Sequence, residues 1–364
     1  MFAMEWIVGI FCLFFLYCVF ITVLLVKRSR RYARRVKQFE ARHRSFNENI
    51  LNSQNESESR FQAAADEALR LTRTFQKFVP KQFVEHMATA NVDDLGLGYA
   101  SENEVAIMFC DIRGFTGFSE RITPHELMNF LNSYFTRMND PIHQNRGFID
   151  KFMGDAIMAL FDHPGGSAQQ KAIDAINAAL DLRKALNIYN GHRKNSNYTA
   201  VNIGIGIHFG PVIMGTVGSE DRMDTTVIGD SVNIASRLEA LTTKYEADIV
   251  VSAQVLQTIG DSCEINTRLL DWVKVKGRQA PIEIYEVLSH LPQDEQSLKL
   301  AVQAKIAAGL ACRINQEWDE AIAFFNAALE INPDDSLAHH HIDVCSIYRN
   351  LELSDDWDGA LVLQ

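Results

Sequence analysis

One part of the sequence alternates strand-like and helix-like patterns in an order that restricts the fold. A near-continuous apolar run, Glu104–Cys110, is typical of a strand buried on both faces. An amphipathic helix is predicted from Pro124, because proline suits the first helical position. Two short alternating strands flank a Gly-Asp turn at 154–155, and a helix at 169–189 and a strand at 201–209 follow. This β-α-β-β-α-β order predicts an α+β fold with a ferredoxin-like sheet.

Two aspartates occupy prominent places in this pattern. Asp111 directly follows the first strand, and Asp155 lies at the tip of the predicted hairpin. Two carboxylates presented in this way can hold two divalent metal ions over a phosphate group. Mg²⁺ prefers such hard oxygen ligands. A single aspartate in a turn more commonly serves as a cap or turn residue, so the pair gains its meaning from the wider context.

Length, charge and cysteine content limit the class of protein. A chain of 364 residues can hold one large domain with appendages, and at most three domains. Its formal net charge of -11 argues against a nucleic-acid partner. The six cysteines show no CxxC spacing, which indicates a reducing compartment rather than a disulfide framework.

The N-terminal region predicts a membrane anchor. Behind a short terminus at residues 1–5, residues 6–26 form an uncharged apolar run of about the 20 residues that a transmembrane helix requires. A basic cluster begins directly after it at Lys27, whereas a cleaved signal peptide would carry its positive charge in front of the apolar core. We therefore expect a single pass through the plasma membrane (the inner membrane of a bacterium). The N-terminus would lie outside without a sensor domain, and the remainder would be cytoplasmic.

Residues 27–79 are predicted to form a basic juxtamembrane segment and a helical linker. Apolar side chains recur there at steps of three and four on both sides of a polar break at 52–60, and Pro80 ends the pattern. Two interpretations stay open. The linker is either a solvated helix with one apolar face or a parallel helical pair that brings two chains together.

Residues 290–364 are predicted to form a helical tail. Five positions fit a tetratricopeptide spacing: Gly309, Ala321, Phe325, Ala328 and Pro333. The pattern covers about one and a half repeats, fewer than the three that stand alone. We favour a helical hairpin packed on the preceding domain, and the alternative is a docking surface for another protein. The consecutive histidines at 339–341 are interpreted as solvated, because such neighbours diverge by about 100° on a helix.

Five sequence blocks, in order and in register, resemble the class III nucleotide cyclase family over about residues 101–289, within a catalytic domain predicted at 80–289. The blocks are Phe109-Cys-Asp-Ile-Arg-Gly-Phe-Thr, Lys151-Phe-Met-Gly-Asp-Ala, Gly204-Ile-Gly-Ile-His-Phe-Gly, Thr226-Val-Ile-Gly-Asp-Ser-Val-Asn-Ile-Ala-Ser-Arg and Val275-Lys-Gly. The resemblance implies an adenylate cyclase that converts ATP to 3′,5′-cyclic AMP and pyrophosphate in signal transduction.

The resemblance also implies the roles of the reacting groups. Asp111 and Asp155, with the backbone carbonyl of Ile112, would hold two Mg²⁺ or Mn²⁺ ions. One ion would lower the pKa of the ribose 3′-hydroxyl, and the other would stabilise the departing pyrophosphate. Asn233 would orient the ribose, and Arg237 would neutralise charge on the α-phosphate in the transition state.

Four further positions would bind the substrate by the same resemblance. Lys151 stands where adenylate cyclases have lysine and guanylate cyclases have glutamate. An ammonium can donate to adenine N1 but cannot accept from guanine N1–H. Thr226 replaces the commonest aspartate, as in a bacterial subgroup, and its hydroxyl can accept from the adenine amino group. Lys276 would contact the terminal phosphates, and Arg222 is a further candidate for the triphosphate.

In this family one chain supplies the metal aspartates and the other supplies the lysine, threonine, asparagine and arginine. The resemblance therefore implies two complete sites in a symmetric homodimer and none in a monomer. Lys151 and Thr226 oppose a guanylate cyclase, and the Gly-Gly-Asp/Glu-Glu-Phe signature of a diguanylate cyclase is absent. An inactive receptor or scaffold would not require all of the metal, ribose and transition-state positions to be filled.

Overall fold

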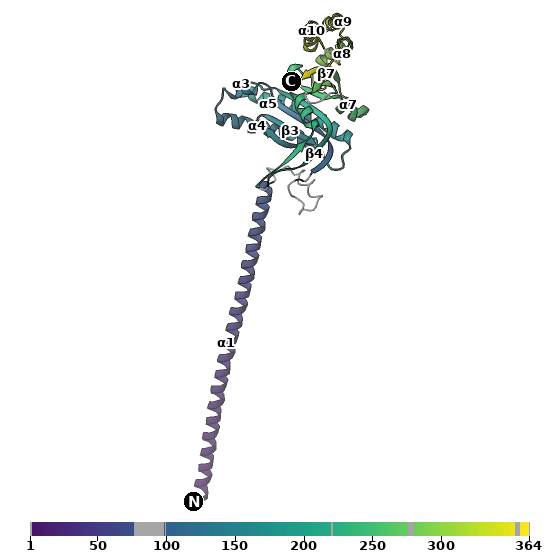
Figure 1. Cartoon of the computed structure of the whole chain (residues 1–364). Helices are drawn as coiled ribbons and strands as arrows, with labels where there is room; N and C mark the ends of the chain where they lie inside the picture. Colours follow the sequence, from purple (N-terminus) through teal and green to yellow (C-terminus); the bar gives the residue numbers. More distant parts are fainter. Residues whose placement is uncertain are drawn as a thin grey trace. The chain divides into compact units, whose positions relative to one another are not determined.

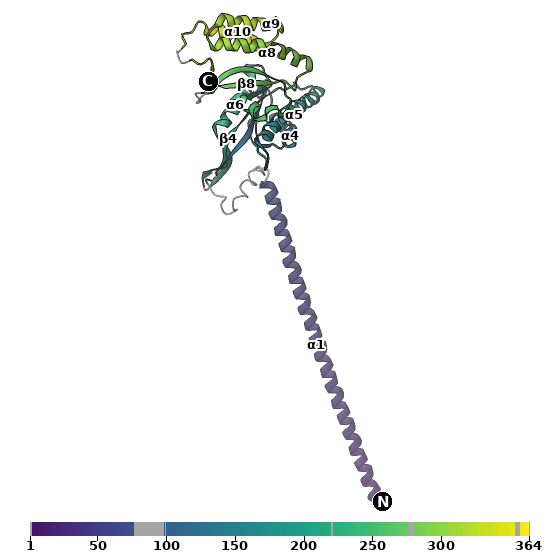
Figure 2. The ribbon, with the colours of Figure 1, turned by 90° about the vertical axis from the view of Figure 1, so that its right-hand side faces the viewer.

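The computed structural model describes residues 2–75, 98, 100–219, 221–275, 280–353 and 357–363. The chain divides into two compact units, Met1–Phe78 and Val79–Gln364. The first unit contains one long helix, α1 (Phe2–Phe75), and the second contains a sheet with helices around it (Figures 1 and 2).

Helix α1 continues through residues 52–60, so the polar residues that separate the two apolar stripes do not interrupt the helix. The polar side chains of this stretch are exposed, and water therefore satisfies them without any change in the backbone. Apolar side chains of the expected stripe are exposed as well, with Phe39 at 66%, Phe46 at 61% and Phe61 at 74%. Residues 76–97, which include Pro80 and the start of the predicted catalytic domain, lie outside the described residues.

In the part of the chain that the structure describes, no helix combines the length and apolarity needed to cross a membrane. The span predicted at 6–26 belongs to α1. Within that span, the side chains of residues 6–8 and 10–14 lie outside those described.

The described strands form one nine-stranded sheet in the order β2-β3-β1-β4-β6-β8-β7-β9, with β5 paired to β4. Neighbouring strands are antiparallel except for the parallel pairs β4–β6 and β7–β9. The strands are β1 (Ala100–Ile112), β2 (Phe148–Met153), β3 (Ala156–Phe161), β4 (Ile203–Ser219), β5 (Arg222–Ile228), β6 (Ile249–Ser252), β7 (Thr267–Val275), β8 (Ile282–Val287) and β9 (Leu361–Leu363).

The helices of the second unit complete the predicted β-α-β-β-α-β order, which is confirmed from β1 to β4. They are α3 (Phe115–Ser119), α4 (Pro124–Gln144), α5 (Ala168–Asn195), α6 (Asp230–Lys244), α7 (Ala253–Ile259), the 3₁₀ helix η2 (Gly260–Ser262), α8 (Gln293–Ile314), α9 (Trp318–Leu329) and α10 (Ser336–Tyr348). Helix α4 begins as predicted at Pro124. A capping box fixes this start, because the Thr123 hydroxyl accepts from the Glu126 amide at 3.3 Å and Glu126 Oε2 accepts from the Thr123 amide at 2.9 Å.

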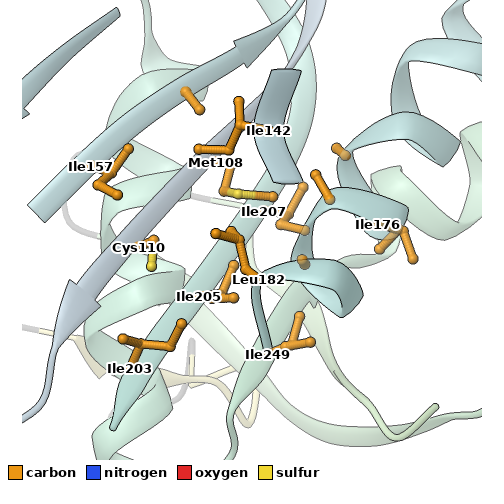
Figure 3. Packing of buried hydrophobic residues seen from close by; sticks show 14 of the residues in the cluster. Met108, Cys110, Ile142, Ile157, Ile176, Leu182, Ile203, Ile205, Ile207 and Ile249 are labelled. Carbon is orange, nitrogen blue, oxygen red and sulfur yellow. The ribbon is translucent and has the colours of Figure 1, made fainter. Parts of the chain in front are cut away.

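Strand β1 is buried on both faces, as its apolar run predicts. Met108 and Cys110 point into a core that α4 and α5 complete, shown in Figure 3. Ile107 and Phe109 point to the other face, into a second core that includes Ala235 of α6. Because alternate residues serve opposite cores, β1 is held in one register, and Asp111 at its end is fixed in place.

Helix α6 lies very close to β4. A Cβ atom at Gly206 would lie 2.1 Å from the backbone nitrogen of Glu239 and 2.6 Å from the carbonyl oxygen of Ala235. Only a residue without a side chain permits this approach. The contact sets the height of α6 over the sheet.

Within the second unit, the tail helices pack on α6 and on the sheet. Val302, Ile306 and Phe325 share a hydrophobic core with Leu238 of α6 and Leu270 of β7. Figure 2 shows α8, α9 and α10 together beside β8. Of the two arrangements that the sequence left open, the tail thus adopts the one in which it packs on the preceding domain.

The interpretation of residues 339–341 as solvated is wrong in part. His341 is fully buried and His340 is half-buried, whereas His339 is exposed. The tail helices stack on β7, and this tertiary contact covers the side of α10 that carries His341.

We predict that Gly206→Ala lowers the free energy of unfolding by about 1–3 kcal/mol, the usual cost of adding an atom to a full core. The added methyl group would overlap the backbone of α6, which cannot move aside as a side chain could. Urea denaturation measures the change. Gly191→Ala in α5 is the control, because a Cβ there meets nothing within 4 Å. Equal stabilities of the two variants would contradict the close contact.

Candidate active site

The metal aspartates predicted from the sequence lie together in one cleft of about 340 Å³. Asp111 is the last residue but one of β1, and Asp155 lies in the turn between β2 and β3. Strands β1 and β3 pair with Cys110 opposite Ile157, which brings the two carboxylates to the same end of the sheet. Ile112 lines the same cleft, as the prediction for its carbonyl group requires.

Asp155 has the electrostatics of a metal ligand. Gly154 precedes it in a left-handed conformation, with φ of 67°, which turns the hairpin so that Asp155 faces the cleft. Burial, the hydrogen bond shared with Asp111 and the charge of Asp111 together raise the pKa of Asp155 to about 7. Its Oδ2 atom is buried without a hydrogen-bond partner among the described residues. A carboxylate pair with an unsatisfied oxygen fits a hard divalent cation, which would offset the charge repulsion.

A third carboxylate, Glu239 of α6, lines the same cleft, and the sequence analysis missed it. Burial and then the charge of Asp111 raise its pKa to about 7, while Arg113 opposes the shift. Its place depends on the close approach of α6 to β4, so spacing alone could not reveal it. The one sequence signal for Glu239 is its position two residues beyond Arg237, where the fourth sequence block ends.

Arg113 closes the cleft against the end of α6. Its Nη2 donates to the carbonyl oxygen of Ala247 at 2.6 Å and to that of Thr242 at 3.3 Å. Asp248 lies 3.6 Å from the same nitrogen. The segment after β1 is thereby tied to the segment that follows α6, and the cleft keeps its width.

The two predicted base-recognition residues meet in this chain. Lys151 Nζ on β2 donates to Thr226 Oγ1 on β5 at 3.3 Å, across 75 positions of sequence. Asp150, which the sequence analysis also missed, lies 3.4 Å from the same ammonium. Burial raises the pKa of Asp150, and the neighbouring Lys151 opposes that rise. Asp150 is therefore placed to hold the lysine against Thr226.

Asn233 and Arg237 lie on α6, four residues apart, and so project from the same side of the helix. Asn233 is exposed, and Arg237 is half-buried. The helix begins at Asp230 after its N-cap residue Gly229, which directly follows β5, the strand that carries Thr226.

Two predicted substrate-binding residues remain, Arg222 and Lys276, and the structure describes only the first of them. Arg222 begins β5 and is exposed. Lys276 lies outside the described residues, one position beyond the end of β7 at Val275.

The predicted residues thus form separate groups within one chain. Asp111, Ile112 and Asp155 line the cleft, whereas Lys151, Thr226, Asn233 and Arg237 are not among the residues that line it. Among the described residues, the metal group and the other four predicted residues are therefore not all found in this one cleft.

A second group of possible metal ligands occurs at the tail. Asp271, His340 and His341 have ligand atoms within 4.8 Å of one another. The guanidinium of Arg313 already occupies this group, because it is bonded to Asp271 and lies 3.3 Å from His341 Nδ1. A resident cation makes this group a poor metal site.

The raised pKa of Asp155 predicts how stability depends on pH in metal-free protein. Protonated Asp155 contributes stability that is fully present below its unfolded pKa of 3.8 and is lost as the pH rises through about 7. Asp155→Asn removes this titration. Relative to the variant, the parent should lose stability between about pH 4 and pH 7 in urea denaturation with a chelator. Asp140→Asn, an exposed change on α4, is the control. A parent-to-variant difference that is constant with pH would contradict the raised pKa.

Comparison with known proteins identifies the family. The family model described as the adenylate and guanylate cyclase catalytic domain matches residues 98–289, more than half of the chain. An adenylate cyclase of Anabaena cylindrica is 39% identical over 243 residues, which cover 65% of this chain and 47% of that protein. The terminal-differentiation specific adenylate cyclase of Dictyostelium discoideum is 35% identical over 278 residues, covering 76% of this chain and 13% of that protein.

The chain therefore spans less than half the length of either relative. A solved structure of a bacterial light-regulated adenylyl cyclase is 27% identical, with a TM-score of 0.54, and covers 64% of this chain and 65% of that one. The matched family model, the ordered sequence blocks and the aspartate cleft agree, and the chain belongs to the class III family of adenylate and guanylate cyclase catalytic domains.

Proposed function

We propose that this chain is an adenylate cyclase that converts ATP to 3′,5′-cyclic AMP and pyrophosphate at two sites shared by a homodimer, in signal transduction. The observation that carries the proposal is the division of the site within one chain. The cleft with Asp111 and Asp155 is lined by neither Lys151 nor Arg237. A second copy can supply the missing groups to each cleft, and a two-fold axis then makes both sites complete.

Asp111, Asp155 and the Ile112 carbonyl would hold two Mg²⁺ or Mn²⁺ ions, for which their oxygen donors are suited. When bound, such ions supply Lewis-acid activation of the 3′-hydroxyl and charge stabilisation of the triphosphate. Glu239 adds a third carboxyl group to the cleft wall. The cleft therefore attracts cations strongly and would repel a bare triphosphate.

The pair of Lys151 and Thr226 supports adenine as the base. The ammonium of Lys151 can donate to adenine N1, and the Thr226 hydroxyl 3.3 Å away can accept from the adenine amino group. Guanine would present its N1–H to the ammonium, and two donors cannot bond. ATP is therefore the expected substrate, and GTP the expected competitor that is rejected.

The side chains of α6 would act on the reacting end of the nucleotide. Asn233 would orient the ribose, so that the 3′-hydroxyl faces the α-phosphorus, and Arg237 would neutralise the charge that develops there. Lys276 beyond β7 would contact the terminal phosphates as a point charge, and Arg222 would also reach the triphosphate.

The exposed apolar side chains support a dimer. Phe152 on β2, Val217 on β4, and Met223 and Ile228 on β5 are 49%, 50%, 51% and 54% exposed. Contiguous exposed apolar side chains mark protein–protein interfaces, and three of these four lie on the paired strands β4 and β5. The exposed stripe of α1 would pair with the same helix of the second copy.

We further propose that the N-terminal segment anchors the chain in the plasma membrane with the catalytic domain in the cytoplasm. The support is the uncharged run at 6–26 and the basic cluster that follows it. The tail could also meet another protein, although its packed apolar face leaves only its outer surface for that purpose.

Mixing two inactive variants tests the shared sites. Asp155→Ala and Arg237→Ala should each form no cyclic AMP as full-length protein with ATP and Mn²⁺. After subunit exchange at equal amounts, roughly a quarter of the parental activity should return. Half of the dimers would then be mixed, and each would keep one intact site of two. A mixture no more active than its components would place each site within one chain.

Lys151→Glu tests the choice of base. The kcat/KM for ATP should fall by about tenfold to a hundredfold, because a hydrogen bond to a charged group contributes about 1.5–3 kcal/mol. The ratio of GTP to ATP turnover should rise, since a carboxylate can accept from guanine N1–H. Lys184→Glu is the matched control, because the Lys184 side chain on α5 is 73% exposed. An equal loss with both nucleotides would show that Lys151 does not read the base.

Flotation of the full-length protein with lipid vesicles tests the anchor. Replacing Leu16, Val19 and Phe20 with aspartate should release the protein, because a charge at the centre of a span costs about 2.5–3.5 kcal/mol per residue. The same replacement at Phe39, Phe46 and Ile50 is the control. Release of the parent itself by carbonate at high pH would contradict a membrane-spanning anchor.

A further inference from the structure

A buried carboxylate joins the tail to the helix that carries Asn233 and Arg237. Asp271 on β7 is fully buried and pairs with the guanidinium of Arg313, which lies in the last turn of α8 and is also fully buried. The second oxygen of Asp271 accepts from the hydroxyl of Tyr245 at 2.5 Å. Tyr245 is the C-cap residue of α6. One side chain of β7 therefore holds the tail and the end of α6 together.

The hydrogen bonds around Arg313 leave its guanidinium and the imidazole of His341 little freedom to reorient. Its Nη1 lies 3.3 Å from His341 Nδ1, and a guanidinium can only donate, so Nδ1 accepts. The proton of the imidazole then sits on Nε2, which donates to the Leu270 carbonyl oxygen at 2.8 Å. Arg313 Nη2 also donates to the Gly359 carbonyl oxygen at 3.3 Å. Arg313 thus contacts β7, α10 and the segment before β9 at once.

A second buried ion pair makes a similar connection nearer the start of β7. Arg268 donates to Glu286 of β8 at 2.6 Å and to Asp335, the N-cap residue of α10, at 2.7 Å. The side chains of all three are at most 2% exposed. Buried charges are tolerated only when they are paired with good geometry, so these contacts specify one docking position for the tail.

Apolar packing places the tail directly behind α6. Ile234, Leu238, Leu241 and Tyr245 recur at steps of four, three and four along α6, and they share one core with the tail. Asn233 and Arg237 lie on the adjoining stripe of the same helix. The tail strand β9 also extends the sheet, with Leu361 opposite Val273.

We propose that the tail is a positioning element of the active site, in which Arg313 acts through Asp271 and Tyr245 to fix α6 and with it Asn233 and Arg237. The inference rests on the proposed cyclase function for its effect on turnover. The base-reading pair on β2 and β5, and the two metal aspartates on β1 and in the β2–β3 turn, lie on other elements. The tail therefore governs the transition-state step more than the binding of ATP.

Tyr245→Phe tests the proposal, because it removes one hydroxyl and keeps the ring in the shared core. In full-length protein kcat should fall roughly tenfold, in line with the cost of a small misplacement of catalytic groups, while the KM for ATP stays within about twofold. Tyr285→Phe on β8 is the matched control, since its hydroxyl donates to Glu283 of the same strand at 2.8 Å. Unchanged kcat in Tyr245→Phe, or an equal loss in both variants, would overturn the proposal.

Hydrogen exchange of the α6 amides gives a readout that does not depend on activity. Exchange near the end of α6 should be faster in Tyr245→Phe than in the parent, and unchanged in Tyr285→Phe. Arg313→Lys should act in the same direction, because a lysine keeps the charge but cannot reproduce the contacts with His341 and Gly359. If the parent makes no cyclic nucleotide, the proposed function fails. Faster exchange would still support the positioning role, and unchanged exchange would overturn it.

Discussion

Contact between α6 and β4 determines where the candidate site can form. Gly206 lets the backbone of α6 approach so closely that any side chain would overlap Glu239. Strand β4 pairs along its length with β1, with Asp111 opposite Gly204. The same contact therefore sets the position of α6 relative to the metal aspartates, and it brings Glu239 into their cleft.

Helix α6 is held from its other side by the tail. Its inner surface meets the sheet, and its outer stripe shares a core with α8 and α9. Tyr245 at its end bonds to Asp271, which pairs with Arg313 of the tail. A helix confined in this way presents Asn233 and Arg237 from a rigid support, and rigid placement lets such groups stabilise a transition state without reorganisation.

The sequence was sufficient for the parts of the fold that local pattern controls. The apolar run before Asp111, Pro124 at the start of α4 and the turn at 154–155 all predicted the observed elements. Glu239, Asp150 and the network of Arg313 were missed, because each acquires its meaning from elements distant in sequence. The polar residues at 52–60 separate the two apolar stripes without ending α1, since exposed polar residues do not prevent a helix.

The identity and ratio of the products test the central claim most directly. Purified full-length protein would be incubated with ATP and Mn²⁺, and the nucleotide and phosphate products separated and counted. The account predicts cyclic AMP and pyrophosphate in equal amounts, because the 3′-hydroxyl displaces pyrophosphate from the α-phosphorus in one step. Formation of ADP and phosphate, or no turnover by folded protein, would contradict it.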